Sequence, residues 1–161
     1  MIPKPNKIHR LPRREAVTIL AGFRCEDGIV ICADTQETVE PAKRAVPKLR
    51  YEESDNNGGH MAAAFCGAGH GPFTDKLIDR CWEDAQLSTS LDDACDEIEK
   101  RIKGTYREYG RIYQTGKCPE VELIWGVKMN GASRMFHAYG PLVNESPSIK
   151  HAGRGSIWQI F

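Results

Sequence analysis

Short apolar or β-prone stretches alternate with polar turn sequences along much of the chain. Residues 18–25 and 29–33 are two such stretches, and the Glu26-Asp27-Gly28 sequence between them favours a tight turn. This pattern predicts a β-hairpin. The polar and charged stretch 36–47 is interpreted as a loop. Further strands are expected at residues 48–53, 61–65, 121–127, 134–139 and 149–152.

Two amphipathic helices are expected in the middle of the chain. Pro72 suits the first turn of a helix, and Ser90 lies three residues before Asp93, as in a capping box. Apolar residues recur at helical spacing after both signals: Phe73, Leu77, Ile78, Cys81, Trp82 and Ala85, then Leu91, Ala94, Cys95, Ile98, Ile102, Tyr106 and Tyr109. Strands, two helices and further strands predict an α+β protein whose antiparallel sheet carries helices on one face.

The length and charge of the chain exclude several classes. Its 161 residues favour one domain, and 22 basic against 22 acidic residues give no electrostatic case for a nucleic-acid partner. Residues 1–17 nevertheless sum to +4, so residues 18–161 sum to −4. The basic stretch 1–17 holds three prolines without periodicity and is interpreted as a flexible leader. No apolar run approaches the roughly 20 residues of a membrane helix, so no membrane partner is expected.

The cysteines and histidines show no metal-ligand spacing. No pair of the six cysteines is spaced C-x-x-C, which favours buried reduced thiols in a cytoplasmic protein. The five histidines likewise lack the spacing of a metal site. We therefore expect no metal ion and no cofactor.

Thr18, Asp34 and Lys48 form the first candidate site. Because a hairpin returns the chain to its start, Asp34 should lie near Thr18, and Lys48 could reach the same end. A threonine hydroxyl is a weak nucleophile that needs a base, and the α-amine of Thr18 could serve if Thr18 began a mature chain. A nearby lysine would lower the pKa of that amine, and Asp34 would hold the lysine. The alternative is a plain Asp–Lys surface pair worth under about 1 kcal/mol.

The glycine-rich sequence 67–71 is the second candidate. Its backbone N–H groups could bind a dinucleotide phosphate at a helix N-terminus, although Pro72 replaces the third glycine of that motif. One N–H could instead stabilise an oxyanion during acyl transfer. Glycines there could also simply let a strand turn into a helix. His70, inside this sequence, is the histidine most worth mutating.

Four sequences in order along the chain resemble those of one enzyme family. They are TILAGFRCEDGIVICADTQ (18–36), KLRYEE (48–53), MAAAFCGAGHGPFTDKLID (61–79) and HAGRGSIW (151–158). They are similar to the opening hairpin, the lysine-led strand, the strand before the first helix and the Gly-Ser-Gly-Ser segment of proteasome β-type subunits and the bacterial HslV peptidase. The resemblance covers roughly residues 18–161.

The resemblance implies an N-terminal-nucleophile (Ntn) hydrolase, a four-layer αββα sandwich of antiparallel sheets that acts as a threonine peptidase. Thr18 matches the nucleophile, Asp34 its acidic partner and Lys48 the lysine of that family. Gly67 matches the glycine whose N–H helps to form the oxyanion hole, and Ser156 matches the second serine of Gly-Ser-Gly-Ser. The implied partners are other copies or related subunits in a ring, an ATPase unfoldase and polypeptide substrates.

The sequence departs from the family before its proposed nucleophile. Residue 17 is Val, where self-processing precursors carry Gly, and a β-branched residue hinders the turn needed for Thr18 to attack the preceding carbonyl. Without removal of residues 1–17, Thr18 has no free amine. A non-catalytic structural subunit of the same fold is therefore the alternative function, and a nucleotide-binding module that uses residues 67–71 is a third.

Other departures affect the remaining positions. The spacing from Thr18 to Lys48 is two residues shorter than usual, so Lys43 is an alternate lysine. Arg154 replaces the assisting serine of the family, and His70 or Gly71 replaces an acidic residue before the first helix.

The family fold continues beyond the Gly-Ser-Gly-Ser segment with two more helices, whereas this sequence ends in the apolar run 157–161. From their basic, non-periodic sequence, we expect residues 1–17 to be a leader or propeptide-like segment. Residues 18–161 are expected to form an Ntn-hydrolase domain that lacks its C-terminal part.

Overall fold

Ten strands and two helices make up the part of the chain that the computed structural model describes, residues 18–39, 42–56, 58–112, 118–146 and 149–153. The helices are α1 (Gly71–Ala85) and α2 (Leu91–Ile112). The strands are β1 (Ile19–Cys25), β2 (Gly28–Ala33), β3 (Gln36–Val39), β4 (Ala42–Ala45), β5 (Leu49–Asn56), β6 (Gly59–Gly69), β7 (Val121–Met129), β8 (Ala132–Tyr139), β9 (Leu142–Glu145) and β10 (Ile149–Gly153).

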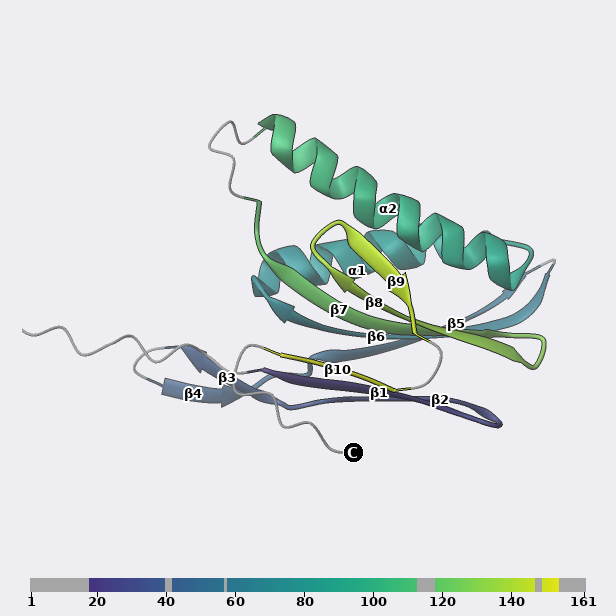
Figure 1. The fold of residues 1–161 in the computed structure, drawn as a ribbon, viewed down its shortest axis with the longest axis horizontal. Coiled ribbons are helices and arrows are strands. Elements are labelled where there is room, and N and C mark those ends of the chain that lie inside the picture. The colour runs from purple at the N-terminus through teal and green to yellow at the C-terminus, as the bar shows by residue number, and fades with distance from the viewer. Residues whose placement is uncertain (1–17, 40–41, 57, 113–117, 147–148, 154–161) are drawn as a thin grey trace, which may run out of the picture.

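The described elements form three layers (Figure 1). A five-stranded antiparallel sheet, β5-β6-β7-β8-β9, lies in the middle. Helices α1 and α2 cover one of its faces, and the three-stranded antiparallel sheet β10-β1-β2 covers the other. The α+β class with antiparallel sheets is thus confirmed. The expected four-layer sandwich is not, because the described residues include no helical layer beyond the three-stranded sheet.

Two hydrophobic cores hold the layers together. The main core joins the helices to the five-stranded sheet and includes Phe65, Leu77, Ile98 and Trp125. The satellite core lies between the two sheets and consists of Leu20, Cys66, Ala68, Ile124 and Met135. Strand alternation explains the division, because successive residues of β6, β7 and β8 point to opposite faces.

Local sequence signals set most of the connections. The Asn130-Gly131 turn between β7 and β8 has positive φ at both residues, 51° and 82°, as a two-residue hairpin turn requires. Ser90 caps α2, since its Oγ accepts a hydrogen bond from the N–H of Asp93 at 3.2 Å. The cap expected at Ser90 is therefore present.

The loop expected at residues 36–47 is wrong over most of its length, because β3 and β4 pair there as an antiparallel hairpin. A two-stranded ribbon outside the main layers does not have to bury an apolar face, so hydrophobic patterning does not reveal it. The short strand β9 was likewise not expected, and β6 runs to Gly69 rather than to Phe65.

Glycines let the two sheets approach closely. A Cβ at Gly126 of β7 would lie 2.7 Å from Cδ1 and 2.9 Å from Cγ2 of Ile29 in β2. A Cβ at Gly22 of β1 would lie 2.9 Å from Cγ2 of Ile124. Side chains at either position would force the sheets apart.

Gly126→Val should lower the free energy of unfolding by about 1–3 kcal/mol, because the added methyl groups overlap Ile29. Gly104→Ala, in α2 where a Cβ meets nothing within 4 Å, should raise it by about 0.5–1 kcal/mol. Urea denaturation measures both. Equal stability of the Gly126→Val variant and the unchanged protein would contradict the close approach of the sheets.

Candidate active site

The ammonium group of Lys48 contacts both Thr18 and Asp34. Its Nζ donates a hydrogen bond to Thr18 Oγ1 at 3.0 Å and lies 3.1 Å and 3.2 Å from the two carboxylate oxygens of Asp34. The side chains of Lys48 and Asp34 are 13% and 26% exposed. The structure therefore brings together the three residues that the sequence singled out, in a partly shielded ion pair.

The hairpin register explains why Asp34 faces the start of β1. Leu20 pairs with Ala33 in this antiparallel hairpin, so Ile19, which precedes Leu20, lies opposite Asp34, which follows Ala33. There the N–H of Asp34 donates to the carbonyl of Ile19 at 3.0 Å, and the N–H of Ile19 donates to Asp34 Oδ1 at 2.9 Å. Asp34 thus fixes the backbone directly after Thr18 as well as the lysine.

Lys48 comes from the other sheet. It directly precedes Leu49, which pairs with Cys66 of β6. Because β5 and β6 are antiparallel, Gly67, the residue after Cys66, lies opposite Lys48 at the start of β5. Gly67 is buried, and a Cβ there would lie 2.2 Å from Cγ2 of Thr74 in α1, so packing alone requires glycine at this position. Lys43, the alternate lysine, lies in β4, and its side chain is outside the description.

The glycine-rich sequence does not form an open loop. Gly67 and Gly69 belong to β6 and pair with Leu123 and Val121 of β7. His70 caps α1, where its Nδ1 accepts a hydrogen bond from the N–H of Phe73 at 3.3 Å. Residues 67–71, one interpretation of which was a dinucleotide-binding loop, therefore form the end of a strand and the capped start of a helix.

Several expected site positions lie outside the described residues. They are the leader 1–17 with Val17, and the segment with Arg154 and Ser156.

One polar pair was missed by the sequence reasoning. His137 Nε2 of β8 lies 3.1 Å from Glu122 Oε1 of β7, and each side chain is 18% exposed. The two residues lie fifteen positions apart on different strands, so only the register of β7 and β8 could have joined them.

The described cysteines differ in burial, and the described residues hold no cluster of metal-ligating side chains. Among the described residues, no group of three or more His, Cys, Asp or Glu side chains could hold a metal ion. Cys66 and Cys95 are buried, and burial raises the pKa of each thiol to about 12. Cys25 and Cys32, in contrast, are exposed, so the expectation of buried thiols is wrong for these two. Neither helix is apolar enough over a sufficient length to cross a membrane.

Comparison with known proteins places the fold. No family model matches the sequence, and no curated protein matches it significantly. Among solved structures the similar chains are mainly Anbu proteins.

The Gly-1 mutant of Anbu from Hyphomicrobium sp. strain MC1 matches with a TM-score of 0.65 and 17% identity, over 86% of this chain and 61% of that chain. Anbu from Pseudomonas aeruginosa, solved as a helical assembly, matches with a TM-score of 0.63 and 13% identity, over 84% and 61%. BPH from Thiobacillus denitrificans in complex with epoxomicin matches with a TM-score of 0.52 and 18% identity, over 86% and 73%. This chain thus spans 61% of the length of these Anbu chains.

The likeness shows a shared fold, and it corrects the family expected from the sequence. The expectation of a proteasome β-type or HslV-like family is wrong, because the structural neighbours are mainly Anbu proteins together with a BPH. The first three of the four quoted sequences form a hairpin, a strand and a strand–helix junction. Such features follow from the fold, so they do not separate the families that share it.

The ion pair of Lys48 and Asp34 should stabilise the fold. A double-mutant cycle with Lys48→Met and Asp34→Asn should give a coupling free energy of roughly 1–2 kcal/mol, because both groups are partly shielded from water. The same cycle on the exposed pair Glu97–Lys100 should give a smaller coupling free energy, because water screens the two charges. Urea denaturation measures both cycles, and equal coupling in the two would contradict a shielded pair.

Proposed function

We propose that this protein hydrolyses peptide bonds with Thr18 as its nucleophile, once residues 1–17 are removed. The observation that carries the proposal is the contact of Lys48 Nζ with Thr18 Oγ1 at 3.0 Å, with Asp34 holding the same ammonium group. A cation that donates to a hydroxyl oxygen stabilises the negative charge that this oxygen gains as it loses its proton.

The chemistry follows from the free amine that removal of the leader would create. The neutral α-amine of Thr18 takes the proton of Oγ1, and Oγ1 attacks the carbonyl carbon of the substrate. The resulting tetrahedral oxyanion collapses, the C–N bond breaks, and the leaving amine receives the proton. Water then attacks the ester on Thr18 and releases the acid. The amine again accepts and returns a proton in this second step.

Two further residues are assigned roles in this proposal. The N–H of Gly67 would donate to the oxyanion, which its place beside Lys48 at the edge of β6 supports. Ser156, which matches the second serine of Gly-Ser-Gly-Ser, would belong to the same site.

The proposal includes assembly and location. Copies of this chain or related subunits would form a ring that encloses the sites. The helical assembly of Anbu from Pseudomonas aeruginosa supports oligomerisation of a chain with this fold, although a helix is an open arrangement. An ATPase unfoldase would deliver polypeptide substrates to a cytoplasmic complex.

A non-catalytic subunit of the same fold is the second candidate function. Val17 favours it, because a β-branched residue before Thr18 hinders self-processing. In that case the contact between Lys48 and Thr18 is structural, and Thr18 keeps its peptide bond to Val17.

The mass of the purified protein should show a chain that begins at Thr18, and this chain should cleave fluorogenic peptides. Thr18→Ala should lower cleavage by at least about a thousandfold, because it removes the nucleophile. Thr18→Ser keeps a hydroxyl group and should retain measurable activity. Epoxomicin, which the BPH of the same fold binds, serves as an active-site probe and should bind the processed chain but not the Thr18→Ala variant.

The matched control is Thr89→Ala, an exposed threonine between the helices that should leave cleavage unchanged. A purified full-length chain without peptidase activity, even in its assembled form, would favour the non-catalytic subunit.

A further inference from the structure

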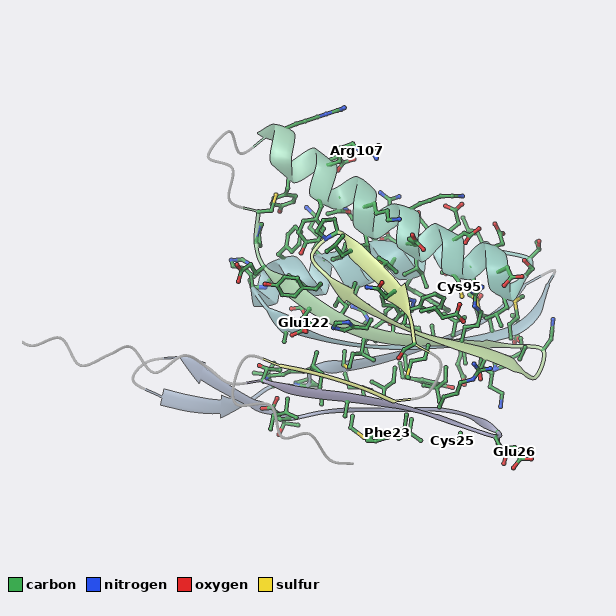
Figure 2. All side chains as sticks on the ribbon, viewed as in Figure 1. Phe23, Cys25, Glu26, Cys95, Arg107 and Glu122 are labelled. Atoms are coloured by element: carbon green, nitrogen blue, oxygen red, sulfur yellow. The ribbon has the colours of Figure 1, made fainter. Side chains whose placement is uncertain are left out.

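The pair of Glu122 and His137 lies between the two sheets. Because side chains alternate along a strand, Glu122 shares a face of β7 with Ile124, and His137 shares a face of β8 with Met135. Ile124 and Met135 both belong to the satellite core between the sheets. In Figure 2, Glu122 accordingly lies on the side of β7 that faces the three-stranded sheet. The pair therefore closes one end of the satellite core.

That end is the one that carries Thr18. Glu122 pairs with Ala68, the residue after Gly67. Lys48 lies beside Gly67 on the next strand, so Glu122 is two strand spacings, about 10 Å, from Lys48 across the sheet. Leu20, two residues after Thr18, packs in the same satellite core as Ala68. Glu122 thus lies on the five-stranded sheet near the end where Lys48 contacts Thr18.

Other ionisable residues lie on the strands around this pair. They are Arg24, Cys25, Cys32, His60, Cys66, Lys128, Arg134, Tyr139 and Glu145, with Asp34, Lys48 and Glu120 next to these strands and Lys150 and His151 of β10, whose side chains lie outside the description. The Cys66 thiol stays neutral, since burial raises its pKa to about 12. Asn144 of β9, opposite His137, carries no charge.

A carboxylate in this place carries a cost unless it has a partner. Removing a half-buried charge from water is unfavourable, and the contact with His137 at 3.1 Å offsets part of that cost. An apolar pair would close the satellite core without any such cost. A charged pair at this end of the satellite core therefore acts on the Thr18 end through its charge as well as through packing.

We propose that Glu122, held by His137, is a positioning residue that sets the electric field in which the Thr18 amine loses its proton. The inference rests on the proposed function. Lys48 disfavours the protonated amine, and the carboxylate of Glu122 favours it. The balance of these two charges keeps the pKa of the amine near working pH, so that the amine can both accept and return a proton.

The test is the pH profile of kcat/KM for peptide cleavage by the processed, assembled protein. In Glu122→Gln the acid limb, which reports deprotonation of the free amine, should move to lower pH by about half a pH unit. Glu122→Asp keeps the charge and should restore the limb to its original place. Glu108→Gln removes an exposed carboxylate of α2 and should leave the limb unchanged.

A second readout does not depend on turnover. The pH dependence with which an amine-selective acylating reagent labels Thr18, followed by peptide mass, should shift by the same half unit in Glu122→Gln. An unshifted limb and unshifted labelling in a folded, active variant would overturn the inference and leave the proposed function standing. Loss of activity without a shift of the labelling profile would show a structural role for Glu122 and would also overturn it. A processed protein that cleaves nothing would overturn the proposed function, and this inference with it.

Discussion

The ammonium group of Lys48 connects the two sheets at the end where the chemistry is proposed. Thr18 and Asp34 belong to the hairpin of the three-stranded sheet, whereas Lys48 leads into the five-stranded sheet. The Lys48 ammonium group thus connects the Thr18 hydroxyl and the Asp34 carboxylate of the hairpin to the five-stranded sheet. Because a shielded cation without partners is costly, the fold and the geometry of the site constrain each other.

The apolar contact between the sheets sets how well that cation can reach its partners. The absence of a Cβ at Gly22 and Gly126 leaves room for the side chains of Ile124 and Ile29 between the sheets. Leu20 fills the satellite core directly after Thr18, which anchors the start of β1. A wider separation would lengthen the contact of Lys48 with Thr18 Oγ1, so packing far from the site still controls its geometry.

Sequence reasoning predicted the proximity of Thr18, Asp34 and Lys48 better than it predicted the layers around them. Thr18 and Asp34 lie at the two ends of one predicted hairpin, so local pairing alone brings them together. Lys48 is harder to place, because only packing between sheets decides which lysine reaches the hairpin. Glu122 and His137 carry no local signal at all, since their contact depends on the register of two later strands. The polar ribbon of β3 and β4 was missed because hydrophobic periodicity reports burial rather than strand pairing.

The two candidate functions differ by one covalent bond rather than by the shape of the site. Asp34 binds both the N–H and the carbonyl of Ile19, so the backbone after Thr18 is fixed whatever precedes it. The hydroxyl oxygen of Thr18 already accepts a hydrogen bond from Lys48. Cleavage of the peptide bond between Val17 and Thr18 would therefore add a base to a nucleophile and a cation that are already in place. In such a preorganised site, removal of residues 1–17 would change the protonation of Thr18 and would need no rearrangement of the described contacts.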